Sequence, residues 1–293
     1  MPKPVRPVLH ALRVHPVKSM AGCTPDSAVV EPWGLAGDRR WTLIDATGKA
    51  VTQRQQPRLA LARAEPRPDG GIRLSAPGID PLVIGVPRSD DTVVADIFGT
   101  KVESVLAGPD TRDAVGADAA HAAHQDVHRT LSRYLGVEVR LVHLDDPAVR
   151  RPVDPIFARP GETVSFADGF PLLVTTTASL DALNSLIAQG DHPDEGPLPM
   201  ERFRPNLVVA GASPWEEDDW RRIAVGEVAF RVAKPCGRCV ITTTDQRTGE
   251  RGKEPLRTLG RYRRFGGQLI FGQNLVPEST GTLRVGDPVT VLE

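Results

Sequence analysis

Short runs of apolar and β-branched residues, separated by glycines and prolines, make up much of the first hundred residues of the chain. Their length and composition are typical of strands, at 12–17, 28–30, 41–44, 72–74, 82–84 and 93–95. Gly48 lies between two such runs, in the segment 45–49, and can adopt the positive φ of a hairpin turn. The spacing of these elements predicts a small β-barrel or sandwich.

The pattern changes near residue 118. Residues 119–135 contain neither Gly nor Pro and repeat their apolar side chains at helical intervals, which predicts a helix. A strand is expected next, over 137–144, and the proline-rich run 145–155 predicts a connection. We therefore expect three parts: an N-terminal β-barrel-like domain at 1–118, a helix–strand connection at 119–150 and a second domain at 151–293.

The second half combines strands with an amphipathic helix. Residues 171–176 predict a strand that runs into this helix, with Ser179 as its N-cap and Leu183 and Ile187 on its buried face. Further β-branched runs predict strands at 206–209, 223–232, 240–244 and 281–292. The expected class is therefore α+β and β-rich, with a second β-barrel domain that carries a few helices.

Composition narrows the classes of function. The 36 Lys and Arg residues against 37 Asp and Glu residues give a net charge of −1, which argues against a general nucleic-acid binder. No apolar run approaches the roughly 18 residues of a membrane span, and the N-terminus lacks the apolar core of a secretory signal. Three cysteines cannot form a disulfide framework, and reduced thiols indicate a cytoplasmic setting.

The sharpest chemical feature is the motif Cys236-Gly237-Arg238-Cys239. A thioredoxin-like redox pair needs its first cysteine at a helix N-terminus, but the β-branched run 240–244 favours a strand. A structural zinc site needs four ligands, and neither a second cysteine pair nor suitably spaced histidines complete one. Two interpretations stay open. Cys239 is a single soft sulfur ligand for the metal of a larger cofactor, or one or both cysteines are simply buried.

Several polar residues lie at the ends of predicted strands. Lys18 and Ser19 stand side by side at a turn, where an ammonium and a hydroxyl can bind a phosphate or another anion. Arg39 enters a strand, and Arg204 and Asn206 share one face of another, which offers donors and acceptors for a polar heterocycle. Taken singly, such residues are more often solvated surface groups than ligands.

Nine short motifs follow one another along almost the whole chain. They are PVKS at 16–19, GDRRW at 37–41, TQRQQPRL at 52–59, FRPN at 203–206, CGRC at 236–239, TTD at 243–245, KEPLRTL at 253–259, FGQN at 271–274 and GTLRVGD at 281–287. In this order they resemble the MOSC N-terminal β-barrel domain followed by a MOSC domain, the molybdenum cofactor sulfurase C-terminal domain. Within that family the chain is similar to the mitochondrial amidoxime reducing component and its bacterial counterparts.

The resemblance implies a MOSC-type β-barrel in the second domain and a molybdenum cofactor, that is, molybdenum bound to molybdopterin. In that family the second cysteine of the motif ligates the metal, so the resemblance makes Cys239 the expected metal ligand and catalytic residue. It also places Gly237 and Arg238 at the pterin phosphate, where glycine permits close backbone approach and arginine offers paired donors. The other matching cofactor-binding positions are Lys18, Ser19, Arg39, Asp168, Arg204, Asn206 and Asn274.

The resemblance further implies an oxidoreductase that cleaves the N–O bond of small N-hydroxylated substrates. A separate electron-donor protein, of the ferredoxin, cytochrome or flavin-reductase type, is expected because the sequence has no Gly-rich dinucleotide fingerprint. No nucleic-acid or membrane partner is expected. Two other functions stay open: a sulfur carrier that holds a persulfide on Cys239, and a non-catalytic carrier of the cofactor.

Two departures from the family pattern bear on these expectations. Relatives often have a tyrosine where Asn274 stands, so this contact with the cofactor is expected to differ. Some bacterial relatives also carry a ferredoxin-like domain with clustered cysteines, whereas this sequence has three cysteines in all. We therefore expect no iron–sulfur centre in the chain itself.

Overall fold

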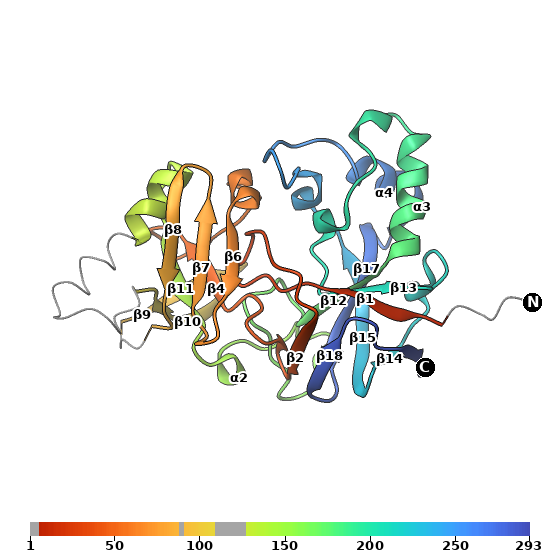
Figure 1. Ribbon diagram of the computed structural model, residues 1–293, viewed down its shortest axis with the longest axis horizontal. Helices are drawn as coiled ribbons and strands as arrows, with labels where there is room; N and C mark the ends of the chain where they lie inside the picture. The colour runs from red at the N-terminus through yellow and green to blue at the C-terminus, as the bar shows by residue number, and fades with distance from the viewer. Residues whose placement is uncertain (1–5, 88–90, 109–126) are drawn as a thin grey trace, which may run out of the picture.

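Antiparallel strands build the first lobe of the molecule, at the left of Figure 1. The computed structural model describes residues 6–87, 91–108 and 127–293. A five-stranded sheet has the order β5-β4-β11-β10-β9, and a second sheet of the same lobe has the order β6-β7-β8. These strands are β4 (Trp41–Ile44), β5 (Ala50–Val51), β6 (Arg63–Pro66), β7 (Ile72–Ala76), β8 (Ile79–Ile84), β9 (Thr92–Ile97), β10 (Thr100–Leu106) and β11 (Arg140–His143).

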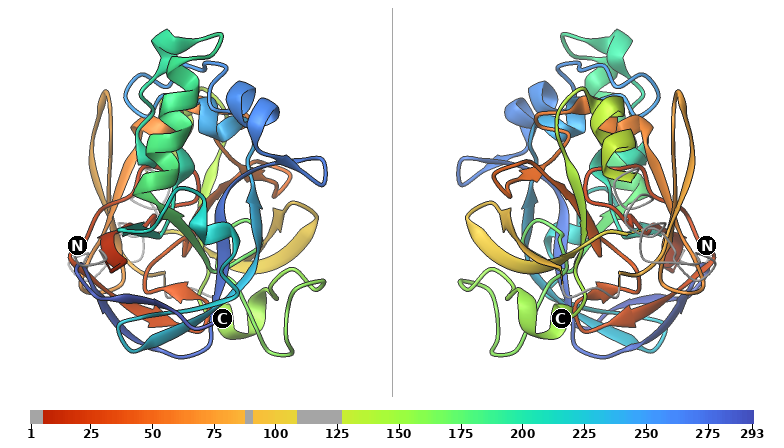
Figure 2. Two further views of the ribbon diagram at one scale, coloured as in Figure 1. Left: turned by 90° about the vertical axis from the view of Figure 1, so that its right-hand side faces the viewer. Right: turned by 90° about the vertical axis from the view of Figure 1, so that its left-hand side faces the viewer.

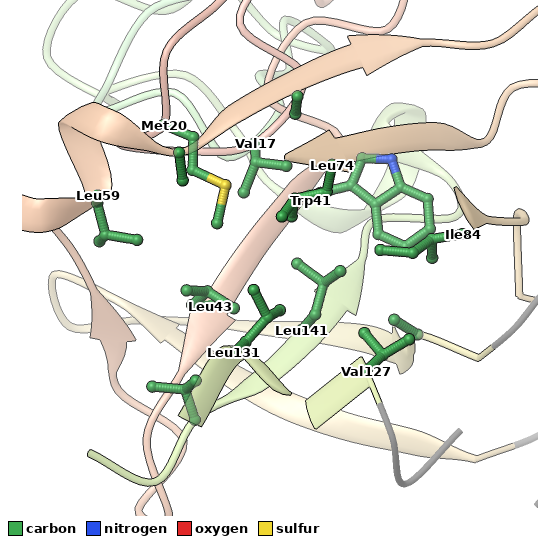
Figure 3. Packing of buried hydrophobic residues seen from close by; sticks show 14 of the residues in the cluster. Val17, Met20, Trp41, Leu43, Leu59, Leu74, Ile84, Val127, Leu131 and Leu141 are labelled. Carbon is green, nitrogen blue, oxygen red and sulfur yellow. The ribbon is translucent and has the colours of Figure 1, made fainter. Parts of the chain in front are cut away.

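Apolar side chains from these strands form the core of the first lobe. The register pairs Leu43 of β4 with Leu141 of β11, and both side chains are fully buried. Leu131, from the helical residues 127–135, packs into the same core, as Figure 3 shows. The predicted helix is thus confirmed from residue 127 onward, while residues 119–126 lie outside the described part of the chain.

A nearly closed barrel forms the second lobe. Its sheet has the order β1-β13-β12-β17-β15-β14-β19, with β16 paired to β17. Closure comes from the backbone of Leu9, whose N–H donates to the Asp287 carbonyl and whose carbonyl accepts from Gly286, both over 2.8 Å. The strands are β1 (Val8–Leu12), β12 (Leu172–Thr176), β13 (Leu207–Ala210), β14 (Arg222–Val225), β15 (Val228–Gly237), β16 (Arg264–Phe265), β17 (Gln268–Pro277) and β19 (Val289–Val291).

The N-terminal strands belong to this second lobe. Strand β1 pairs with β13, and β2 (Ser27–Glu31) lies between β18 (Gly281–Arg284) and β3 (Gly34–Leu35) in a three-stranded sheet. The chain therefore starts in the second lobe, passes into the first after β3 and returns after β11 (Figure 1). The β-rich α+β class is confirmed. The domain limits expected at 118 and 150 stay predictions.

Helix α3 (Thr177–Ala188) connects β12 to β13, which pair in parallel, as a crossover connection requires. Its predicted buried face is confirmed, because Leu183 and Ile187 are fully buried. The predicted N-cap is wrong: the Thr176 side chain accepts from the N–H of Ser179, so the last residue of β12 caps the helix. The other described helices are η1 (Pro57–Leu61), α2 (Pro147–Arg150), η3 (Pro193–Glu195), η4 (Met200–Phe203), η5 (Glu216–Asp218), η6 (Val240–Thr243) and α4 (Leu256–Tyr262).

Two predicted strands are wrong for local reasons. Residues 240–243 form the 3-10 helix η6. The hydroxyls of Thr242 and Thr243 each donate to the carbonyl oxygen three residues earlier, over 2.9 and 2.8 Å, which stabilises tight turns in a β-branched run. The strand expected at 12–17 coincides with β1 (Val8–Leu12) only at Leu12, and beyond it Val14 and Val17 form isolated bridges with Cys23 and Trp41. Pro16, which lacks the N–H that a strand ladder needs, lies within this segment. Among the described helices, none is long and apolar enough to cross a membrane.

Candidate active site

A cleft of about 370 Å³ lies where the N-terminal residues 18–54 meet the loops of the second lobe. This volume falls in the range of small-molecule sites. Ten residues singled out from the sequence line it, although they come from six separate segments of the chain. They are Lys18, Ser19, Arg39, Asp168, Arg204, Asn206, Gly237, Arg238, Cys239 and Asn274.

Strained backbone shapes the cleft wall. Ser19, Arg39 and Arg204 have φ values of +68°, +48° and +54°, and they are three of the five described non-glycine residues with a positive φ. Such conformations persist only where surrounding contacts impose them, and they cluster at functional sites. The Ser19 carbonyl accepts from Gln53 Nε2 over 2.6 Å, and the Arg39 N–H donates to the His15 carbonyl over 2.8 Å. Contacts distant in sequence therefore hold both turns in place.

A carboxylate lies between two cations at one end of the cleft. The Lys18 ammonium donates to the Asp168 carboxylate and, over 2.8 Å, to the Phe166 carbonyl. Arg54 Nη2 donates to the other oxygen of Asp168 over 3.2 Å. Desolvation by the surrounding cleft raises the pKa of the Asp168 carboxyl, but the charges of Lys18 and Arg54 outweigh this effect and lower the pKa overall. Asp168 is therefore an anion that still exposes 61% of its side chain to the cleft.

The Lys18 ammonium, unlike the exposed Asp168 carboxylate, is almost completely buried. Its side chain is only 5% exposed, and burial lowers its pKa from 10.5 to about 8, although Asp168 partly compensates. A group with this pKa can release and regain a proton near neutral pH. The pair thus combines a fixed negative charge with a titratable donor inside the cleft.

This pKa predicts how stability depends on pH. Between about pH 8 and 10.5 the unfolded chain keeps the Lys18 proton that the folded chain has released, so stability should rise with pH. Relative to Lys18→Met, the gain should be on the order of 3 kcal/mol across this window. Urea unfolding of cofactor-free protein at pH 7.5, 9 and 10.5 measures it, with the exposed Lys101→Met as control. Parallel curves for wild type and Lys18→Met would contradict the prediction.

A second group of polar residues that line the cleft is joined by hydrogen bonds. Arg39 donates to Asn206 Oδ1 over 2.9 Å and to the Arg204 carbonyl over 3.1 Å. The buried Asn206 amide also donates to the Arg13 carbonyl and accepts from the Leu173 N–H, so it joins three segments. Burial, together with repulsion from Arg39, lowers the pKa of Arg204 to about 9. The positive charge of Arg204 is therefore held in an unfavourable environment.

Each cysteine of the motif lies against an arginine. Arg54 Nη2 donates to Cys239 Sγ over 3.4 Å, and Arg238 Nη1 donates to Cys236 Sγ over 2.9 Å. Cys239 is the N-cap residue of η6, and Cys236 lies in β15. All three cysteines of the chain are free, and both cysteines of the motif are partly exposed rather than buried. Both sulfurs are thus available to a ligand in the cleft.

Three buried guanidinium nitrogens of the cleft residues have no hydrogen-bond partner in the described part of the chain: Arg54 Nη1, Arg204 Nη2 and Arg238 Nε. An unsatisfied buried donor costs about 1–3 kcal/mol, and more when it is charged. An anion with several acceptor oxygens would satisfy these nitrogens. The donor set therefore fits a phosphate-bearing cofactor whose metal takes a sulfur ligand. Among the described residues, no group of three or more His, Cys, Asp and Glu side chains could hold a metal ion.

Three residues in or beside this site were not predicted from the sequence: Arg54, which lines the cleft, and Arg151 and Phe98, which contact residues that line it. Arg54 lies in the TQRQQPRL motif at 52–59, which by itself gives this arginine no role. Arg151 lies in the proline-rich connection, and its guanidinium donates to three backbone carbonyls of residues 165–168, which fixes the loop that carries Asp168. Phe98 comes from the β9–β10 turn and lies against Lys18 and Arg54. A positive charge in a Pro-rich run and an aromatic residue in a turn were the available signals.

Two family models match the chain. The MOSC N-terminal beta barrel domain matches residues 6–137, and the MOSC domain matches residues 161–290. The chain is similar to the mitochondrial amidoxime-reducing component 1 of Mus musculus, with 33% identity over 96% of this chain and 81% of that protein. Component 1 of Danio rerio is 34% identical over 96% and 84% of the two chains. Component 2 of Homo sapiens is 32% identical over 95% and 81%.

Proposed function

The chain belongs to the MOSC domain family, in the form that carries the MOSC N-terminal β-barrel domain, and we propose that it is a molybdenum-cofactor oxidoreductase that reduces N-hydroxylated compounds. The names of its relatives describe amidoxime-reducing components. The reaction class proposed for this chain follows those names, and the site geometry supports the binding of the cofactor.

One observation carries the proposal. The cleft combines unsatisfied guanidinium donors with an available sulfur, which is the donor set that an anionic pterin phosphate and a thiophilic metal need. Arg204 and Arg238 would hold the anionic part of the cofactor, and Cys239 would be the protein ligand of molybdenum. Gly237 would allow close approach of the cofactor to the backbone, because it has no side chain.

Reduction of an N-hydroxylated substrate consumes two electrons and two protons, breaks the N–O bond and yields an N–H group and water. The bound molybdenum cofactor supplies the two-electron chemistry. Lys18 would hold a proton at the cleft surface, and Asp168 would keep that ammonium in place through their ion pair. Electrons would come from a separate redox protein of the ferredoxin, cytochrome or flavin-reductase type.

Metal and product analysis tests the proposal. Protein purified from a host that makes the cofactor is expected to contain about one molybdenum and one pterin per chain. With a chemically reduced dye as donor it should convert benzamidoxime to benzamidine. The same protein from a cofactor-deficient host is the control. A Cys239 persulfide without molybdenum would instead identify a sulfur carrier, and bound molybdenum without turnover of any N-hydroxylated substrate would identify a cofactor carrier.

A further inference from the structure

Phe98 occupies a position that its own residue type disfavours. It forms, with Gly99, the two-residue turn between β9 and β10, and the two residues have φ values of +54° and +91°. Such a type I′ turn favours Asn-Gly, and a positive φ is strained for a bulky aromatic residue. The ring does not contribute to the core either, because the residue is 54% exposed. Neither the turn nor packing in the core explains a phenylalanine here.

The ring nevertheless lies beside the candidate active site. Its centroid is 4.7 Å from Arg54 Cζ and 5.0 Å from Lys18 Nζ, and both cations line the cleft. Arg54 also donates to Cys239 Sγ over 3.4 Å. A single side chain therefore separates the ring of Phe98 from the sulfur proposed to bind the metal.

The turn is held in place rather than left free at the end of its hairpin. The Gly99 N–H donates to the Asp96 carboxylate over 2.6 Å, and the Asp96 N–H donates to the Gly48 carbonyl over 2.8 Å. Gly48 belongs to the turn between β4 and β5, where its φ of +85° confirms the predicted hairpin. Figure 2 shows the β9–β10 hairpin, in yellow, extending away from the rest of the first lobe. The hairpin thus presents an aromatic ring at a fixed position beside the cleft.

We propose that Phe98 is a substrate-binding residue, on which the apolar or aromatic body of an N-hydroxylated substrate packs while its N–O group reaches the metal bound at Cys239. This inference rests on the proposed function. One part of the ring covers the two cations, and more than half of the residue stays open to a ligand. Aromatic stacking on this open part would favour planar aromatic substrates over substrates that lack an apolar body.

Two substrates, one with an aromatic ring and one without, distinguish a substrate-binding role of Phe98 from a structural role. Phe98→Ala should lower kcat/KM for benzamidoxime roughly tenfold, mainly through KM, because an aromatic contact is lost. For hydroxylamine, which has no apolar body, kcat/KM should stay within about twofold of the wild type. For benzamidoxime, the kcat/KM of Phe98→Leu should lie between those of the wild type and Phe98→Ala. Val94 is an exposed residue on the same hairpin, so Val94→Ala is the matched control and should change kcat/KM for neither substrate.

A binding measurement gives a readout that does not depend on turnover. Calorimetric titration of the cofactor-loaded protein with benzamidine should show roughly tenfold weaker binding for Phe98→Ala. Phe98→Asn should lose affinity equally but keep or raise the melting temperature, since asparagine suits the turn. Equal losses with both substrates, or a Phe98→Asn protein that melts several degrees lower, would show a structural role and overturn the proposal. Absence of turnover with both substrates in the wild type would instead refute the proposed function.

Discussion

Replacing Cys239 with alanine is expected to lower the rate of N–O reduction about a thousandfold or more and to remove molybdenum from the purified protein. Loss of supporting contacts around a metal costs about 10- to 100-fold, and loss of the protein ligand itself should cost more. The fold should survive, because the residue is partly exposed and its sulfur accepts a long hydrogen bond, 3.4 Å, from Arg54. Molybdenum content and melting temperature, measured on the same preparation, separate loss of the ligand from loss of the fold.

The matched control is Cys236→Ala. This cysteine lies three residues earlier in the same motif, is also partly exposed and also accepts from an arginine, over 2.9 Å. If Cys239 alone is the ligand, Cys236→Ala should keep most of the metal and most of the rate. Stoichiometric molybdenum in Cys239→Ala, or equal losses in the two variants, would contradict the assignment.

Replacing Arg204 with methionine is expected to have opposite effects on the loaded and the cofactor-free protein. Retention of the cofactor should fall about a hundredfold, because a charge-assisted contact between a largely desolvated guanidinium and an anion is lost. Without the cofactor, the free energy of unfolding should rise by about 1–2 kcal/mol, because a poorly solvated cation is removed. The unpartnered Nη2 and the pKa lowered to about 9 are the observations behind this second effect. Dialysis followed by pterin analysis measures the first, and urea unfolding measures the second.

Arg202 provides the contrast within the same segment. Its two Nη atoms donate to the Thr243 carbonyl over 2.8 Å and to the Asp245 carboxylate over 3.0 Å, so its charge has an acidic partner in the protein, although its Nε has no hydrogen-bond partner among the described residues. Arg202→Met should therefore destabilise the protein by about 2 kcal/mol or more, since partners are left unpaired. The prediction would be contradicted if Arg204→Met destabilised the protein as much as Arg202→Met does. It would also be contradicted if the Arg204→Met protein retained the cofactor as well as the wild type.

Most strands and helices of this molecule can be predicted from the sequence, because local patterns of apolar residues determine them. The β-branched run at 41–44 coincides with β4, and the helical face of α3 follows from the spacing of Leu183 and Ile187. Motifs in a fixed order also identify nine residues that the fold brings to one cleft, and Asp168, outside these motifs, is the tenth predicted residue there. No single motif could do so, because a lysine at a turn or an arginine in a strand is most often a surface group.

Residues whose roles depend on distant contacts escape such reasoning. Arg54 touches Asp168 and Cys239, which lie more than a hundred residues away in the sequence. Arg151 acts only through backbone carbonyls, which have no sequence signature. The 3-10 helix after Cys239 was missed for another reason. There, the bonds of two threonine hydroxyls outweigh the propensity of a β-branched run.

The pairing of the first strand has a consequence for synthesis on the ribosome. Strand β1 emerges early, yet its partner β13 follows almost two hundred residues later, which takes roughly 10 to 40 seconds at ordinary elongation rates. The contacts that close the barrel join Leu9 to Asp287, which lies 278 residues later in the sequence. During this interval the nascent chain carries an unpaired apolar strand, a situation that chaperones manage in the cell. The lobe that carries Cys239 can close only after Asp287 has been synthesised, so the candidate site cannot be complete before then.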